Sequence, residues 1–182
     1  AEDHDFTGGA TEIMVITNSI NIAGASNLEI SIKVSASGND INNRYEGSDY
    51  LFVEYQLNGS GGWTTIGVFG GGAGAGGAAS YFFHDVLRNG ISGTGDDVQM
   101  IKDMSNITYN INSIAGNPIS GSTMMVRVRF SVAGPQEEVQ FDDIRVTGTA
   151  ASCSITDLTA GTAAPCTNNL YCLLYTSPSP RD

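Results

Sequence analysis

The stretch Thr123–Thr147 constrains the fold of this chain more than any other, because two alternating segments flank a turn at Gly134-Pro135. In the first segment apolar side chains occupy every second position, and polar side chains that include Arg127 and Arg129 lie between them. A two-residue period of this kind is typical of a β-strand with one buried and one solvent-exposed face. The two segments and their turn therefore predict a β-hairpin at the centre of the fold.

The second segment of the predicted hairpin changes phase partway along. Its apolar positions are odd at first and even later: Val139, Phe141, Ile144 and Val146. One extra residue, a β-bulge at Asp142-Asp143, would keep all four side chains on the buried face. The bulge would also place two adjacent carboxylates where the strand is re-aimed.

Short strands follow one another along the rest of the chain, and no segment shows a sustained 3.6-residue apolar period. The expected strands lie at residues 13–16, 18–22, 28–36, 49–57, 63–69 and 106–111, with 81–87 either a strand or a helical turn. We expect 13–16 to be buried, 49–57 and 63–69 to form a hairpin, and the Gly/Ala-rich run 70–79 to be a mobile loop. Roughly eight to ten strands about 8–12 residues apart are typical of an all-β antiparallel sandwich, or jelly roll.

The charge of the chain limits its partners. Among 182 residues there are 8 Lys and Arg against 19 Asp and Glu, a formal net charge of −11. This balance argues against nucleic acid and anionic membranes, which need a basic surface. No apolar run approaches the ~20 residues of a membrane span, so we expect no membrane insertion. The composition suits a soluble extracellular protein or a binder of divalent cations.

The last eleven residues, Cys172–Asp182, resemble the translation of a sequencing adapter. We interpret them as a non-biological tail; the alternative is a natural Ser/Pro-rich tail. The sequence then divides into a sandwich module over 1–148, a further segment over 149–171, and a poorly ordered tail over 172–182.

Several segments carry a resemblance to a known family. They are the opening Ala1-Glu2-Asp3, the strand Asp49–Tyr55, the turn from Asn58-Gly59 to Trp63, and the closing strand Val139–Val146. Together they resemble the jelly-roll modules of large secreted proteins from Bacteroidetes-type bacteria, akin to MAM and laminin-G-like sandwiches. The resemblance implies that an N-terminal edge strand is missing from 1–148. It also implies that residues 149–171 hold a linker and the start of a following repeat, in which Cys153 and Cys166 could form a disulfide or stay free.

Related sandwiches often hold a structural Ca²⁺ between the first and the closing strand, and this chain has acids in both places. The predicted ligands are Glu2, Asp3, Asp5, Asp142 and Asp143. A hard cation prefers several carboxylate and carbonyl oxygens, and it would relieve the repulsion between neighbouring acids. The alternative is a solvated acidic edge in a protein that is acidic throughout.

A second candidate site would bind carbohydrate. Sugars stack on aromatic rings and form hydrogen bonds with the polar side chains around them. The candidate residues are Trp63 and Tyr81, with Arg127 and Arg129 on the wet face of the predicted hairpin; Tyr45 and Tyr50 are further candidates. The alternative for Trp63 is that it caps the core at the start of its strand.

No set of residues points to an enzyme. Paired carboxylates can hydrolyse glycosides across a cleft, but sequence neighbours such as Asp142 and Asp143 would not face each other across a substrate. The only histidines, His4 and His84, have no metal-ligand spacing. We therefore expect a non-catalytic, extracellular module of a larger secreted or surface protein, beside other modules of the same chain. It would bind polysaccharide or cell-surface glycan, or mediate adhesion, with Ca²⁺ as a structural ion. The alternatives are a structural spacer that supports a separate catalytic domain, and a glycoside hydrolase domain.

Overall fold

The computed structural model describes residues 12–37, 45–73, 80–91, 95–111, 121–132 and 137–149. Their strands are β1 (Ile13–Ile16), β2 (Ile20–Asn21), β3 (Ser26–Ser37), β4 (Tyr50–Leu57), β5 (Thr64–Ala73), β6 (Ser80–Asp85), β7 (Val98–Gln99), β8 (Ser105–Asn110), β9 (Thr123–Ser131) and β10 (Glu138–Thr149). They form a seven-stranded sheet in the order β1-β9-β4-β5-β6-β7, with β2 also paired to β9, and a three-stranded sheet in the order β10-β3-β8. All pairs are antiparallel, which confirms the predicted all-β sandwich. Within these residues no helix has the length and apolar character needed to cross a membrane. The predicted tail lies outside them.

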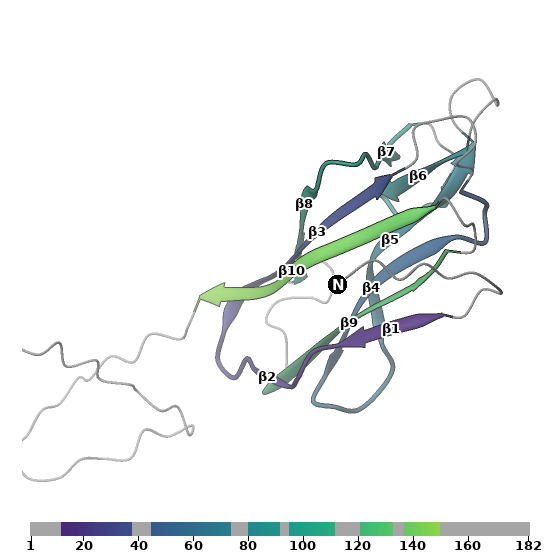
Figure 1. Cartoon of the computed structure of the whole chain (residues 1–182). Coiled ribbons are helices and arrows are strands. Elements are labelled where there is room, and N and C mark those ends of the chain that lie inside the picture. The colour runs from purple at the N-terminus through teal and green to yellow at the C-terminus, as the bar shows by residue number, and fades with distance from the viewer. Residues whose placement is uncertain are drawn as a thin grey trace, which may run out of the picture.

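The predicted hairpin of β9 with β10 is wrong, because the two strands belong to different sheets. β9 pairs with β1, β2 and β4, whereas β10 pairs with β3. Figure 1 shows β3 and β10 side by side, and β9 and β1 together in the lower part of the view. The buried faces of β9 and β10 meet across the sandwich, where the rings of Phe130 and Phe141 pack edge to face with centroids 5.6 Å apart. Alternation along a strand reveals its buried face but not its partner strand.

The predicted bulge in β10 is confirmed. Asp142 lies opposite Lys33 and Arg145 opposite Ser31, so two residues of β10 stand opposite the single residue between them on β3. Asp143 adopts a positive φ of 55° at this point. The extra residue restores the phase, since Phe141 is in the core and Val139, Ile144 and Val146 pack against it.

The glycine-rich run is partly strand rather than loop. β5 continues through Ala73 and pairs with β6, so the loop predicted for 70–73 is wrong there; residues 74–79 lie outside the described part. A Cβ atom at Gly71 would lie 2.1 Å from the backbone oxygen of Glu46. A Cβ atom at Gly67 would lie 2.3 Å from the hydroxyl of Tyr109. The glycines let neighbouring segments approach the strand closely, which a sequence pattern does not show.

β1 is a strand as predicted, but it is not buried. The exposed fractions of Met14, Val15 and Ile16 are 44%, 40% and 48%. β1 is the end strand of the wider sheet. Val15 lies opposite Val128 in the register, so the two side chains share one face of the sheet. Val128 is fully buried whereas Val15 is 40% exposed, which indicates that the wider sheet extends past the narrower one at β1.

A buried polar contact links the two sheets. His84 on β6 stacks on Phe69 with ring centroids 4.6 Å apart, and its Nε2 lies 3.1 Å from the hydroxyl of Tyr109 on β8. Both side chains are only 9% exposed. Burial lowers the pKa of His84, and this outweighs the attraction of Asp85 and Asp97 for the protonated ring. The folded protein therefore favours a neutral imidazole between the sheets.

We predict that Gly71→Ala lowers the free energy of unfolding by about 1–3 kcal/mol, because the added methyl group collides with backbone atoms rather than with a movable side chain. Urea denaturation would measure the change. Gly62→Ala is the matched control, since a Cβ atom at Gly62 has nothing within 4 Å. Equal stability of the two variants would contradict the close approach of residues 45–49 to β5.

We also predict that the protein loses stability as the pH falls through the ordinary pKa of histidine, about 6.5. The unfolded chain takes up a proton there that the folded chain resists, so the free energy of unfolding falls with pH by up to about 1.4 kcal/mol per unit. Urea denaturation between pH 7 and pH 5 would measure it, above the range in which carboxylates titrate. His84→Phe should flatten this dependence, and an unchanged slope in that variant would contradict it.

Candidate functional site

Two arginines lie on the outer face of the seven-stranded sheet. Arg127 and Arg129 alternate along β9 with buried Val126 and Val128, so the packing of the core turns both of them outward. Trp63 immediately precedes β5, and the guanidinium carbon of Arg127 lies 4.2 Å from the centroid of its ring. The structure therefore brings together three of the predicted ligand-binding residues, two on β9 and one just before β5, which are far apart in the sequence.

A buried carboxylate joins these arginines. Glu54 on β4 lies opposite Arg127 in the sheet register and is only 3% exposed. Its Oε2 accepts hydrogen bonds from Nε of Arg127 at 2.6 Å and from Nε of Arg129 at 2.9 Å, and its Oε1 accepts one from Thr65 Oγ1 at 3.1 Å. Burial acts to raise the pKa of Glu54, but the bonds and charges of the two arginines outweigh it, so the pKa lies below its ordinary value. Glu54 is thus ionised and fixes both guanidinium groups.

The second arginine extends the arrangement to the sheet edge. Oε2 of Glu12 accepts two hydrogen bonds, one from Nη1 of Arg129 and one from the hydroxyl of Tyr50, each with a donor–acceptor distance of 2.5 Å. Arg129 also lies 5.0 Å from the ring centroid of Phe52, which stacks with Tyr50 at 4.8 Å. The bond from Tyr50 and the cation of Arg129 lower the pKa of Glu12. We call this group the arginine–aromatic face; it comprises Glu12, Tyr50, Phe52, Glu54, Trp63, Arg127 and Arg129.

The arginine–aromatic face is accessible but ordered by its own contacts. The side chains of Arg127 and Arg129 are 16% and 24% exposed, and Trp63 is half-buried. Trp63 is not part of the core cluster formed by the described residues. Aromatic ring faces, guanidinium donors and carboxylate acceptors lie side by side here, which is the chemistry that a polyhydroxylated ligand needs.

Two other candidate aromatic residues lie elsewhere. Tyr45 is 2% exposed and belongs to the core, where its hydroxyl donates to the backbone oxygen of Glu138 at 2.9 Å. Tyr81 lies on β6, which β4 and β5 separate from β9, and its ring packs edge to face with Phe83. A role of Tyr81 in binding stays a prediction, and the structure does not place it on the arginine–aromatic face.

The predicted calcium ligands at the bulge have partners of their own. The carboxylate of Asp143 lies 2.6 Å from Nε of Arg145 and 3.1 Å from Nζ of Lys33, and these two cations lower its pKa. Oδ1 of Asp142 accepts the N–H of Asp143 at 2.7 Å. The other predicted ligands, Glu2, Asp3 and Asp5, lie outside the described residues, so this ligand set stays a prediction.

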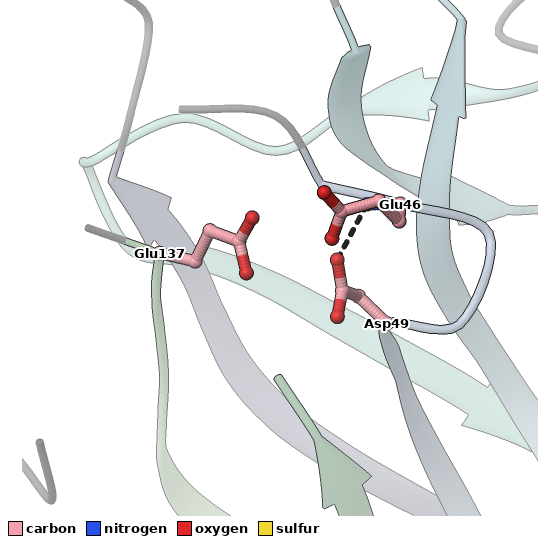
Figure 2. A group of neighbouring side chains, drawn as sticks. All are labelled: Glu46, Asp49 and Glu137. Atoms are coloured by element: carbon pink, nitrogen blue, oxygen red, sulfur yellow. Dashed lines mark hydrogen bonds between the residues drawn. The ribbon is translucent and has the colours of Figure 1, made fainter. Parts of the chain in front are cut away.

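A different acidic group lies at the start of β10, as Figure 2 shows. Glu46 and Asp49 come from the segment before β4, and Glu137 precedes β10 from the other side. The three residues have carboxylate oxygens within 4.8 Å of one another. Asp49 is 2% exposed, and its Oδ2 accepts the N–H of Glu46 at 2.5 Å. Three carboxylates at this spacing could hold a hard cation.

A second group of acids, Asp85, Asp96 and Asp97, also has carboxylate oxygens within 4.8 Å of one another. Here the carboxylates bind the backbone of the segment after β6. Asp85 accepts the N–H groups of Asn89 at 3.1 Å and Gly90 at 2.8 Å, and Asp96 accepts that of Leu87 at 2.8 Å. Through these bonds Asp85 and Asp96 hold the backbone of residues 87–90 in place.

Glu12, Phe52 and Glu54 are the members of the arginine–aromatic face that sequence reasoning missed. Glu54 occupies a polar position of its strand, which the alternation marks as outward-facing. Its role depends on the register that places β4 beside β9, and no pattern within either strand specifies that register.

Comparison of the chain with family models, curated proteins and solved structures finds no match. The arrangement of the chain's own residues is therefore what bears on its function.

Proposed function

We propose that this protein is a non-catalytic, extracellular binding module of a larger secreted or surface protein, and that its arginine–aromatic face binds a polysaccharide or cell-surface glycan. The observation that carries the proposal is the meeting of Trp63 with Arg127 and Arg129 on one outer sheet face. In the sequence Trp63 lies more than sixty positions before the two arginines. Their meeting supports a shared role.

The chemistry of the arginine–aromatic face suits a sugar. The ring faces of Trp63 and Tyr50 can cover the C–H groups of a pyranose ring. The guanidinium group of Arg127 can donate to sugar hydroxyls, while the carboxylate of Glu12 at the rim accepts from them. Because ion pairs and ring contacts already hold these side chains, little conformational entropy remains to be lost on binding.

The ionisation of the same carboxylates supports a non-catalytic role. Glycoside hydrolysis needs a carboxyl group whose raised pKa keeps it protonated as a general acid. The pKa values of Glu12 and Glu54 are both lowered by their partners, and so is that of Asp143 at the bulge. These carboxylates are held as anions, which is the wrong state for an acid catalyst.

The setting of the module rests on composition and resemblance. A net charge of −11 suits a soluble extracellular protein. The resemblance to modules of large secreted proteins makes other modules of the same parent chain its natural neighbours. A structural Ca²⁺ belongs to this proposal, and the acidic group of Glu46, Asp49 and Glu137 supports it, because a cation would relieve the repulsion among three close carboxylates.

We predict that Trp63→Ala weakens binding to glycan by roughly tenfold, equivalent to about 1.4 kcal/mol, because it removes the ring on which a sugar would stack. Retention on a panel of immobilised neutral polysaccharides would identify a ligand, and titration calorimetry with a soluble oligosaccharide of that ligand would measure the change. Leu87→Ala is the control, since Leu87 is 67% exposed and lies after β6, away from the arginine–aromatic face. A wild-type protein that binds no glycan would favour the structural spacer instead. Equal affinities of Trp63→Ala and Leu87→Ala would exclude Trp63 from the binding site.

We predict that Ca²⁺ raises the melting temperature and that a chelator lowers it, because an ion that binds only the folded state stabilises it by about 2.7 kcal/mol at a hundredfold excess over Kd. Differential scanning calorimetry would measure both. The double variant Asp49→Asn, Glu137→Gln should abolish the response, whereas Asp96→Asn, in the other acidic group, should keep it. A melting temperature that changes with neither Ca²⁺ nor chelator would remove calcium from the proposal.

A further inference from the structure

The arginine–aromatic face has no surplus charge. Its cations are Arg127 and Arg129, and its anions are Glu54 and Glu12. One oxygen of Glu54 binds both arginines, while Glu12 binds Arg129 at the rim. Two positive and two negative groups therefore cancel within one continuous network of contacts.

The donors of Arg129 that usually recognise anions are already in use. A guanidinium group binds carboxylates and sulfates through a fork of two parallel N–H groups. In Arg129, Nε and Nη2 point to the two oxygens of Glu54 at 2.9 and 3.4 Å, and Nη1 points to Glu12. Arg127 directs its Nε to Glu54 at 2.6 Å. An anionic ligand that bound Arg129 through such a fork would have to displace Glu54, which has almost no exposed surface on which to rehydrate.

We infer that Glu54 makes the arginine–aromatic face select uncharged glycans and reject uronate and sulfated ones; as a statement about glycans, this rests on the proposed function. A sugar hydroxyl both donates and accepts hydrogen bonds, so it can join the network at Arg127 and at Glu12 without breaking an ion pair. A sulfate or carboxylate group offers acceptors alone and brings a charge that meets two carboxylates. The net charge of −11 adds long-range repulsion of polyanions. Glu54 acts here as a positioning residue for both arginines.

The inference is tested by turning rejection into binding. Glu54→Gln keeps the shape of the side chain and leaves the two arginines with only Glu12 as a counter-charge. We expect the wild-type protein to pass through heparin-agarose at low ionic strength and Glu54→Gln to be retained. In solution the variant should bind heparin at least about fivefold more tightly, with the gain lost as salt screens the freed charge.

Two further variants test whether the gain in heparin binding comes from the arginine–aromatic face rather than from the change in net charge. Glu29→Gln makes the same change in net charge on β3, in the other sheet, and should behave like the wild-type protein. Because Glu54 is buried, circular dichroism must show that Glu54→Gln is folded. Glu12→Gln is the second arm, since the Glu12 side chain is 34% exposed at the rim and its loss should give a smaller gain of the same sign.

The outcomes separate the inference from the proposed function. Heparin or alginate binding by the wild-type protein at least as tight as its neutral-glycan binding would overturn the inference and leave glycan binding intact. Equal heparin binding by Glu54→Gln, Glu12→Gln and Glu29→Gln would also overturn it. If the wild-type protein bound no neutral polysaccharide, the proposed function would instead be overturned. Heparin binding by the wild-type protein and by Glu54→Gln would still decide whether Glu54 excludes anions.

Discussion

The structure depends on the burial of one face of each long strand between two sheets of unequal width. Phe130 and Phe141 meet in that interior, one from each sheet. Once the apolar faces are enclosed, the two-residue period of a strand directs the remaining side chains outward. Arg127 and Arg129 lie side by side on the outer face as a result, because Val126 and Val128 must be inside. The hydrophobic effect thus sets the positions of the polar groups that the proposed function uses.

Electrostatics then turns that outer face into a defined surface. Glu54 is 3% exposed although it lies on the outer side, because Arg127, Arg129 and the side chains around them cover it. A buried carboxylate without partners would be costly, and removing one partner of such a pair is usually more damaging than replacing both. The ion pairs and the stacked rings therefore hold one another in place, and the geometry of the arginine–aromatic face comes largely from contacts within it.

Alternation along the chain predicted which residues lie in strands and which face the core, including the phase change at Asp143. It also predicted the pairing of β4 with β5 across a short turn, but not the partners of β9 and β10. The two segments of Thr123–Thr147 were predicted to form a hairpin because each alternates and a turn lies between them. The same sequence pattern arises when the two strands lie in facing sheets. Ile13–Ile16 appeared buried because apolar content does not reveal that a strand lies at the end of a sheet. The role of Gly71 depends on a close approach by a distant segment, which composition cannot express.

The bulge in β10 has a consequence for assembly. Among the described residues β10 is an end strand of its sheet, and an end strand offers a row of unpaired backbone groups to any extended neighbour. The extra residue at Asp143 interrupts the spacing of that row, and Lys33 and Arg145 surround the interruption with charge. The feature that keeps Phe141 and Ile144 in the interior thus also protects this rim of the sandwich from fibril-like growth by edge-to-edge stacking of copies.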